Sequence, residues 1–212
     1  MSSEPGRQTR HSFSFGASYD PERVSFGPLI ALNDDVLGTG AGYDVHEHAD
    51  VVLVTWVVSG TLEHRDASGT STQGAGDLAI TRAGTGITHS ERAAGGVTRF
   101  VQAWLRPEEA GGEPSRRVTT PDLSDGDLAT VATADDLSVP GATLRIAELP
   151  RGASAKIPAA ALCYVFVSSG ALARSSLAEP LAAGDAFEIR DEPARTVTAA
   201  VDTQLLVWSF AE

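Results

Sequence analysis

Apolar and β-branched residues in this chain gather in short segments, which glycine, aspartate and proline separate at close spacing. Typical segments are VVLVTWVVSG (51–60), VTRFVQAWL (97–105), ALCYVFVSSG (161–170) and TQLLVWSF (203–210). Segments of this length and composition are typical of β-strands in a sandwich or barrel. Helical periodicity is weak except in SDGDLATVATADDL (124–137), where we expect Ser124 or Asp125 to cap one short helix. The pattern therefore predicts an all-β protein.

The strand pattern occurs twice. VVSGTLEHRD (57–66) aligns with VSSGALARSS (167–176), and GAGDLAITR (74–82) aligns with AAGDAFEIR (182–190). The matched positions are Gly60 with Gly170, Leu62 with Leu172, Asp77 with Asp185, and Trp104 with Trp208. Because the matches follow in order at a nearly constant offset, we infer a duplicated β-barrel.

The boundary between the repeats is expected in the polar, proline-bearing segment 106–123. We assign residues 1–118 to the first domain and residues 119–212 to the second. A chain of 212 residues holds two domains of roughly 100 residues, and each of these is large enough to bury a core.

Charge and cysteine content restrict the function. The formal net charge of -12 disfavours direct contact with nucleic acid or with anionic membranes. Cys163 is the only cysteine, which excludes an intrachain disulfide and fits a reducing compartment. The first residues lack the apolar core of a secretory signal, and the run VVLVTWVV (51–58) is too short to span a bilayer. We expect a cytoplasmic protein.

Two histidine-containing motifs suggest a metal site. His46 and His48 stand in GYDVHEHAD directly before an apolar segment, and His89 and Glu91 stand in AGTGITHSE after a glycine-containing turn. Side chains two residues apart on a strand point to the same face. Two antiparallel strands would therefore gather three imidazoles and one carboxylate in a barrel interior, a ligand set that suits a divalent transition metal.

Simpler interpretations remain for each motif alone. An isolated His-x-His in a loop is commonly a solvated pair, and these ligands would also suit a closed structural zinc site. His64 is either an exposed partner of Asp66 or a wall of the site, and His11 is assigned to the surface or to strand packing.

The second repeat serves as an internal control, because a structural requirement would be met in both copies. At an offset of 110, the paired histidines correspond to Lys156 and Pro158. At an offset of 108, the His-x-Glu motif corresponds to Val197 and Ala199. The second repeat has no ligand at these positions, which favours a functional role for the first set.

On an octahedral ion, four protein ligands would leave two positions for dioxygen and a chelating substrate.

Several motifs together resemble the pirin family, a bicupin branch of the cupin superfamily. They are RHSFSFG (10–16), FGPLIALNDD (26–35), HEH (46–48), GTLEHRD (60–66), GDLAITRAGTGITHSE (76–91) and QAWLRPEE (102–109). The resemblance implies two tandem cupin (jelly-roll) β-barrels, of which only the N-terminal one binds metal. It implies the ligands His46, His48, His89 and Glu91 and one divalent ion, usually described as iron, which we expect as Fe(II). By the chemistry of the ligands alone, Ni, Mn, Cu or Zn are alternatives.

The chain departs from the common pirin pattern at Glu47, where proline is usual, and at Val52, where glutamate is usual. Neither position is a pirin metal ligand. A change there would act on the surroundings of the ligands or on the pocket wall.

The resemblance implies an activity like quercetin 2,3-dioxygenase, in which a flavonol or similar enol reacts with O2. In that reaction Glu91 would either leave the metal or accept the flavonol proton as general base. A non-catalytic, metal-dependent regulator that binds a protein partner is the alternative. A third interpretation is a cupin acting on another small, oxygen-rich molecule. Fold alone does not distinguish these functions.

Overall fold

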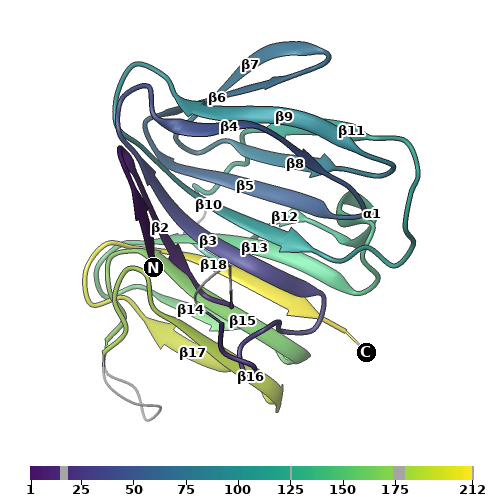
Figure 1. Ribbon diagram of the computed structural model, residues 1–212. Helices are drawn as coiled ribbons and strands as arrows, with labels where there is room; N and C mark the ends of the chain where they lie inside the picture. Colours follow the sequence, from purple (N-terminus) through teal and green to yellow (C-terminus); the bar gives the residue numbers. More distant parts are fainter. Residues whose placement is uncertain (15–18, 125, 174–179, 212) are drawn as a thin grey trace. The chain divides into compact units, whose positions relative to one another are not determined.

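The computed structural model describes residues 1–14, 19–124, 126–173 and 180–211 (Figure 1). The chain divides into two compact units, Met1–Pro121 and Asp122–Glu212. Apart from one helical turn, the described elements are β-strands, so the predicted all-β fold is confirmed. In the described part of the chain, no helix is long and apolar enough to span a membrane.

The first unit consists of two antiparallel sheets. The seven-stranded sheet contains, in spatial order, β1 (Ser2–Glu4), β2 (Arg7–His11), β3 (Leu29–Leu37), β10 (Thr98–Leu105), β5 (Val52–Ser59), β8 (Leu78–Arg82) and β11 (Ser115–Thr119). The four-stranded sheet contains β4 (Gly42–His48), β9 (Ile87–Ala93), β6 (Thr61–Asp66) and β7 (Gly69–Gly74). An apolar cluster of Leu37, Val57, Leu62, Ala93 and Phe100 draws on strands of both sheets. Burial of these side chains holds the two sheets together.

The second unit repeats this plan with fewer strands. Its five-stranded sheet contains β12 (Ala129–Ala132), β13 (Ala142–Leu149), β18 (Thr203–Phe210), β15 (Ala160–Ser169) and β16 (Ala186–Glu192). Its two-stranded sheet contains β14 (Ser154–Ile157) and β17 (Arg195–Thr198). An apolar cluster that includes Cys163, Val165 and Val207 forms its core.

The predicted helix over 124–137 is wrong in extent and in its cap. Only the turn α1 (Ala134–Leu137) is helical, and Thr133 caps it, with the Asp136 carboxylate accepting from the Thr133 amide at 2.8 Å. Residues 129–132 form β12 instead, because they pair with β13. Ser124 lies in a turn, and Asp125 lies outside the described residues.

The two units share a glycine turn that accounts for the sequence repeat. Gly60 and Gly170 have φ values of 81° and 78°, in the left-handed region. In each unit a threonine at the start of a later strand, Thr98 or Thr203, lies within hydrogen-bond distance of both backbone groups of the residue that follows the glycine. An equivalent threonine therefore connects the equivalent glycine turn to a later strand in each repeat.

The Gly-Asp turn is also repeated. The Asp77 carboxylate accepts the Gly74 amide at 2.7 Å, and the Asp185 carboxylate accepts the Ala182 amide at 2.8 Å. Because each aspartate closes its own turn, the repeated Gly-Asp pairs are explained by turn geometry rather than by a shared ligand.

Replacing Gly60 with alanine is expected to destabilise the first unit. A Cβ atom at this position would lie 2.4 Å from the Val97 carbonyl oxygen, and the left-handed backbone alone costs about 1–2 kcal/mol for alanine. Urea unfolding followed by circular dichroism measures the effect. Gly96→Ala is the control, because among the described residues no atom beyond its chain neighbours lies within 4 Å of its added Cβ. Equal urea midpoints for the two variants would contradict this account of the turn.

Candidate metal centre

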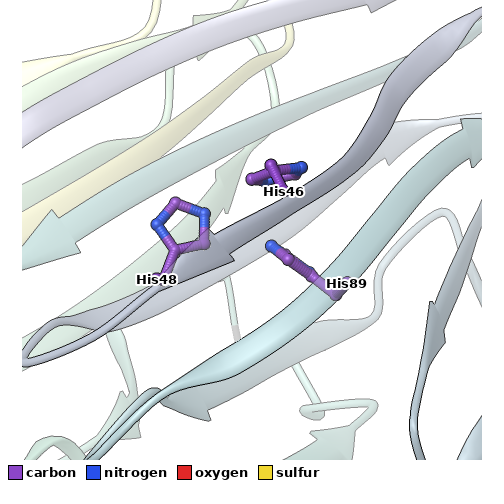
Figure 2. A group of neighbouring side chains, drawn as sticks. All are labelled: His46, His48 and His89. Carbon is purple, nitrogen blue, oxygen red and sulfur yellow. The ribbon is translucent and has the colours of Figure 1, made fainter.

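The His-x-His and His-x-Glu motifs lie on neighbouring strands. In the antiparallel pair of β4 and β9, His46 lies directly opposite His89, and His48 lies two residues further along β4. Burial alternates along β4, where Glu47 is exposed and the flanking histidines are partly buried. Figure 2 shows the two histidines of β4 and His89 of the adjacent strand gathered in one place. The predicted shared face is therefore present.

A β-bulge shifts the register of β4 against β9 just before the two histidines. The register shifts between Tyr43, which pairs with Glu91, and His46, which pairs with His89, so β4 has one more residue than β9 in this interval. The Asp44 carbonyl within the bulge lies 2.7 Å from His46 Nδ1. Because a carbonyl only accepts, His46 Nδ1 carries a proton, and in the neutral ring the lone pair is on Nε2.

The three imidazoles form one compact cluster. Their ring centroids are 4.4 to 5.1 Å apart, and one nitrogen of each ring lies within 4.8 Å of the others. The Nε2 atoms of His48 and His89 are buried and have no hydrogen-bond partner among the described residues. Buried polar atoms normally have a hydrogen-bond partner or bind a ligand, so these two nitrogens are available to a ligand. Together with His46 they form a set of nitrogen donors that fits a divalent transition metal.

Burial keeps two of these rings neutral. It lowers the pKa of His48 to about 4, and the His46 imidazole contributes in the same direction. Burial and the neighbouring imidazoles, His46 first, lower the pKa of His89 to about 3. Both side chains are therefore uncharged at neutral pH, the form in which an imidazole binds metal.

Glu91 lies beside the histidine cluster. It is 4% exposed, and it forms a second group of potential ligand atoms with His64 and His89, all within 4.8 Å of one another. Burial raises the pKa of Glu91 to about 7, and hydrogen bonds from Gln102 oppose the shift. The two groups share His89, so the four predicted residues occupy one region without forming a single cluster at that spacing.

Two side chains of β10 fix the orientation of Glu91. The indole Nε1–H of Trp104 donates to Gln102 Oε1 at 2.9 Å. Since an indole nitrogen only donates, the amide NH2 of Gln102 must face the other way, where it donates to the Glu91 carboxylate at 3.1 and 3.3 Å. Trp104 also presents an edge-to-face contact to His48. Gln102 and Trp104 belong to the QAWLRPEE motif that resembles pirins, but only the structure shows their contacts with Glu91 and His48.

His64 combines features of both sequence interpretations. It is a partner of Asp66, with Nε2 3.1 Å from Oδ2, but it is only 3% exposed. Its Nδ1 lies 3.3 Å from Nδ1 of His89, so His64 lies directly behind a candidate ligand. No pattern in the sequence indicates this contact, because it depends on the pairing of β6 with β9.

A cavity of about 400 Å³ opens next to the histidine cluster, within the size range of small-molecule sites. Its lining residues are Met1, Ser2, Glu4, Arg7, Thr9, His11, Asn33, Tyr43, His46, His48, Glu91, Gln102 and Trp104. The assignment of His11 to surface or strand packing was incomplete. Its Nδ1 donates to Asn33 Oδ1 at 2.8 Å, and its Nε2 lies 3.0 Å from Ser2 Oγ. His11 therefore helps to form the cavity wall.

A buried hydrogen-bond network supports the cavity wall. Tyr43 donates its hydroxyl to Asp35 Oδ1 at 2.6 Å, and Thr9 donates to the same oxygen at 2.5 Å. The Arg7 guanidinium lies 4.1 Å from the centre of the Tyr43 ring, a cation–π contact. Contacts to both the hydroxyl and the ring therefore fix the orientation of Tyr43 in the cavity wall.

The corresponding region of the second unit is apolar. Val197 pairs with Ala155 as His89 pairs with His46, so the inward residues of β14 are Ala155 and Ile157. The predicted correspondence to Lys156 was wrong by one residue, because β4 contains a bulge that a constant offset cannot represent. Val197 and Ala199 lie within the apolar core, which leaves this interior without ligand atoms at the matched positions.

Comparison with known proteins indicates the family of the chain. Residues 1–105 match the family described as Pirin. A putative quercetin 2,3-dioxygenase of Mycobacterium tuberculosis is 37% identical over 96% of this chain and 88% of its own length. The quercetin 2,3-dioxygenase of Escherichia coli K12 is 41% identical over 56% of this chain and 58% of its own length.

Among solved structures, the bacterial pirin YhhW from Escherichia coli in complex with nickel(II) superposes with a TM-score of 0.89. It is 27% identical, and the match covers 99% of this chain and 94% of that one. The match extends over both units, and the relative from Mycobacterium tuberculosis is similar over nearly the whole sequence. The chain therefore belongs to the pirin family of bicupin proteins.

Proposed function

We propose that this pirin is a metal-dependent dioxygenase that opens the heterocyclic ring of a flavonol or of a similar enol, as a quercetin 2,3-dioxygenase does. One observation carries the proposal. The Nε2 atoms of His48 and His89 are buried without a partner among the described residues, beside a cavity of about 400 Å³. A closed structural site would not need such a cavity. Relatives named as quercetin 2,3-dioxygenases support the choice of reaction.

The residues that would hold the ion are His46, His48, His89 and Glu91. Fe(II) is our first choice, and the nickel(II) complex of the related Escherichia coli pirin supports nickel as a second. When bound, such an ion supplies Lewis acidity to the oxygens of the substrate and brings it together with O2.

The protein itself supplies a general base and aromatic residues that line the cavity. With its pKa raised to about 7 by burial, Glu91 is suited to accept the flavonol hydroxyl proton near neutral pH. Gln102 holds the carboxylate in place by donating to both of its oxygens. Tyr43 and Trp104 line the cavity and offer aromatic surfaces to a planar substrate.

Oxygen uptake by metal-reconstituted protein tests the proposal. The apoprotein is loaded anaerobically with Fe(II) or Ni(II), and oxygen consumption is then followed with quercetin and with a panel of smaller enols. We expect consumption of oxygen and loss of substrate in equal amounts. Inertness of the metal-loaded protein across the panel would contradict the proposal and favour the alternative, a metal-dependent regulator with a protein partner. The net charge of -12 favours a protein partner over nucleic acid.

A further inference from the structure

We propose that Asp66 and His64 are positioning residues that determine which nitrogen of His89 carries the proton, and so keep His89 Nε2 available to a metal. The proposal rests on the metal site proposed above. It assigns a role to two residues that lie outside the four proposed ligands.

The first link joins Asp66 to His64 on β6. His64 Nε2 lies 3.1 Å from Asp66 Oδ2. Hydrogen bonds, chiefly from Ser68, lower the pKa of Asp66 to about 2, so the carboxylate is ionised at neutral pH and can only accept. His64 Nε2 must therefore carry a proton.

The second link joins His64 to His89 on the neighbouring strand. Their Nδ1 atoms are 3.3 Å apart, and both side chains are buried. With its single proton on Nε2, neutral His64 accepts at Nδ1, so the proton between the two rings belongs to His89 Nδ1. His89 Nε2 then has a free lone pair, and this buried atom has no other partner in the described part of the chain.

A competing assignment would make His64 itself a ligand, because it forms a group with His89 and Glu91 within 4.8 Å. The hydrogen bonds favour the positioning role. Both nitrogens of His64 are engaged, one by Asp66 and the other by His89. His89 Nε2 remains available, whereas a metal bound at His64 would have to break one of these contacts.

The surroundings of Asp66 allow a sharp test by an isosteric change. Asp66 Oδ1 accepts from the Ser68 backbone amide at 2.8 Å and from its hydroxyl at 2.6 Å. In Asp66→Asn, the amide oxygen is expected to stay at the Ser68 N–H, which points the NH2 group at His64 Nε2. His64 would then accept at Nε2 and donate from Nδ1, and the proton of His89 would move to Nε2. A protonated Nε2 has no lone pair for a metal.

Metal affinity distinguishes this role from simple support of the fold. We expect Asp66→Asn to weaken Ni(II) binding by roughly 10- to 100-fold, and Asp66→Ala to weaken it less, because water can still accept from His64 Nε2. A merely structural role predicts the opposite order, since alanine removes more contacts than asparagine. Asp77→Asn is the control, because Asp77 also accepts from a backbone amide and a hydroxyl but is not hydrogen-bonded to a histidine of the site. Wild-type affinity in Asp66→Asn would overturn the proposal.

Imidazole 15N spectra of the metal-free protein test the same chain without any metal. The signals of His89 are assigned by comparison with His89→Gln. We expect an unprotonated Nε2 of His89 in the wild type and a protonated one in Asp66→Asn. An unprotonated Nε2 in both would refute the positioning role even if the wild type binds metal. Failure of the wild type to bind metal would instead refute the proposed function, and the spectra would still decide the proton positions.

Discussion

Replacing His46 with alanine is expected to remove the bound metal almost completely while the protein stays folded. The substitution deletes one of three imidazoles whose nitrogens lie within 4.8 Å of one another. The fold should persist because the first unit is held by buried apolar side chains such as Phe100 and Leu62, which do not depend on an ion. Metal content per chain after dialysis and the β circular-dichroism spectrum measure the two effects.

Glu47→Ala is the matched control for this substitution. Glu47 lies between the two histidines of β4, but its side chain is exposed, so its removal should leave metal content unchanged. We expect His89→Ala to behave like His46→Ala. Loss of the β signal in both histidine variants would show that the site is structural rather than functional.

Changing Glu91 to glutamine is expected to reduce oxygen consumption with quercetin by roughly 10²- to 10⁴-fold per bound metal, the usual effect of removing a general base. A carboxamide cannot accept the flavonol proton, although it keeps the size of the side chain. Because the change would also weaken metal binding, rates are compared at matched metal occupancy.

The control for Glu91→Gln is Glu63→Gln, the same chemical change in the same four-stranded sheet. Glu63 lies on β6 opposite Arg92 and does not line the cavity. Its replacement should leave the rate per metal unchanged. Equal activity per metal in Glu91→Gln would exclude the base role and leave Glu91 as a ligand at most.

The histidine cluster was predictable because strand geometry is encoded in local spacing. His46 and His48 are two residues apart, as are His89 and Glu91, and each pair faces inward on its strand. The repeated turns were predictable for a similar reason. Gly60 and Gly170 mark positions where a Cβ atom would collide with a backbone carbonyl oxygen. Constraints of this kind act within a few residues and leave a direct trace in the sequence.

Features that depend on pairing between distant segments were not predictable. His64 became part of the site because β6 pairs with β9, which brings it opposite Glu91. His11 reached the cavity wall because β2 pairs with β3 and places it beside Asn33. The bulge in β4 depends on the register with β9 and has no sequence signal of its own. In the segment 129–132, pairing with a neighbouring strand decided the structure against a weak helical pattern.

Anomalous diffraction at the absorption edge of the bound metal tests the central claim most directly. Crystals of the protein loaded with Ni(II) or Fe(II) would locate the ion without reference to activity. We predict one anomalous peak per chain, in the first unit, within coordination distance of the Nε2 atoms of His46, His48 and His89. A peak bound by His64 in place of the β4 histidines, a peak in the second unit, or no peak in metal-loaded crystals would contradict the account.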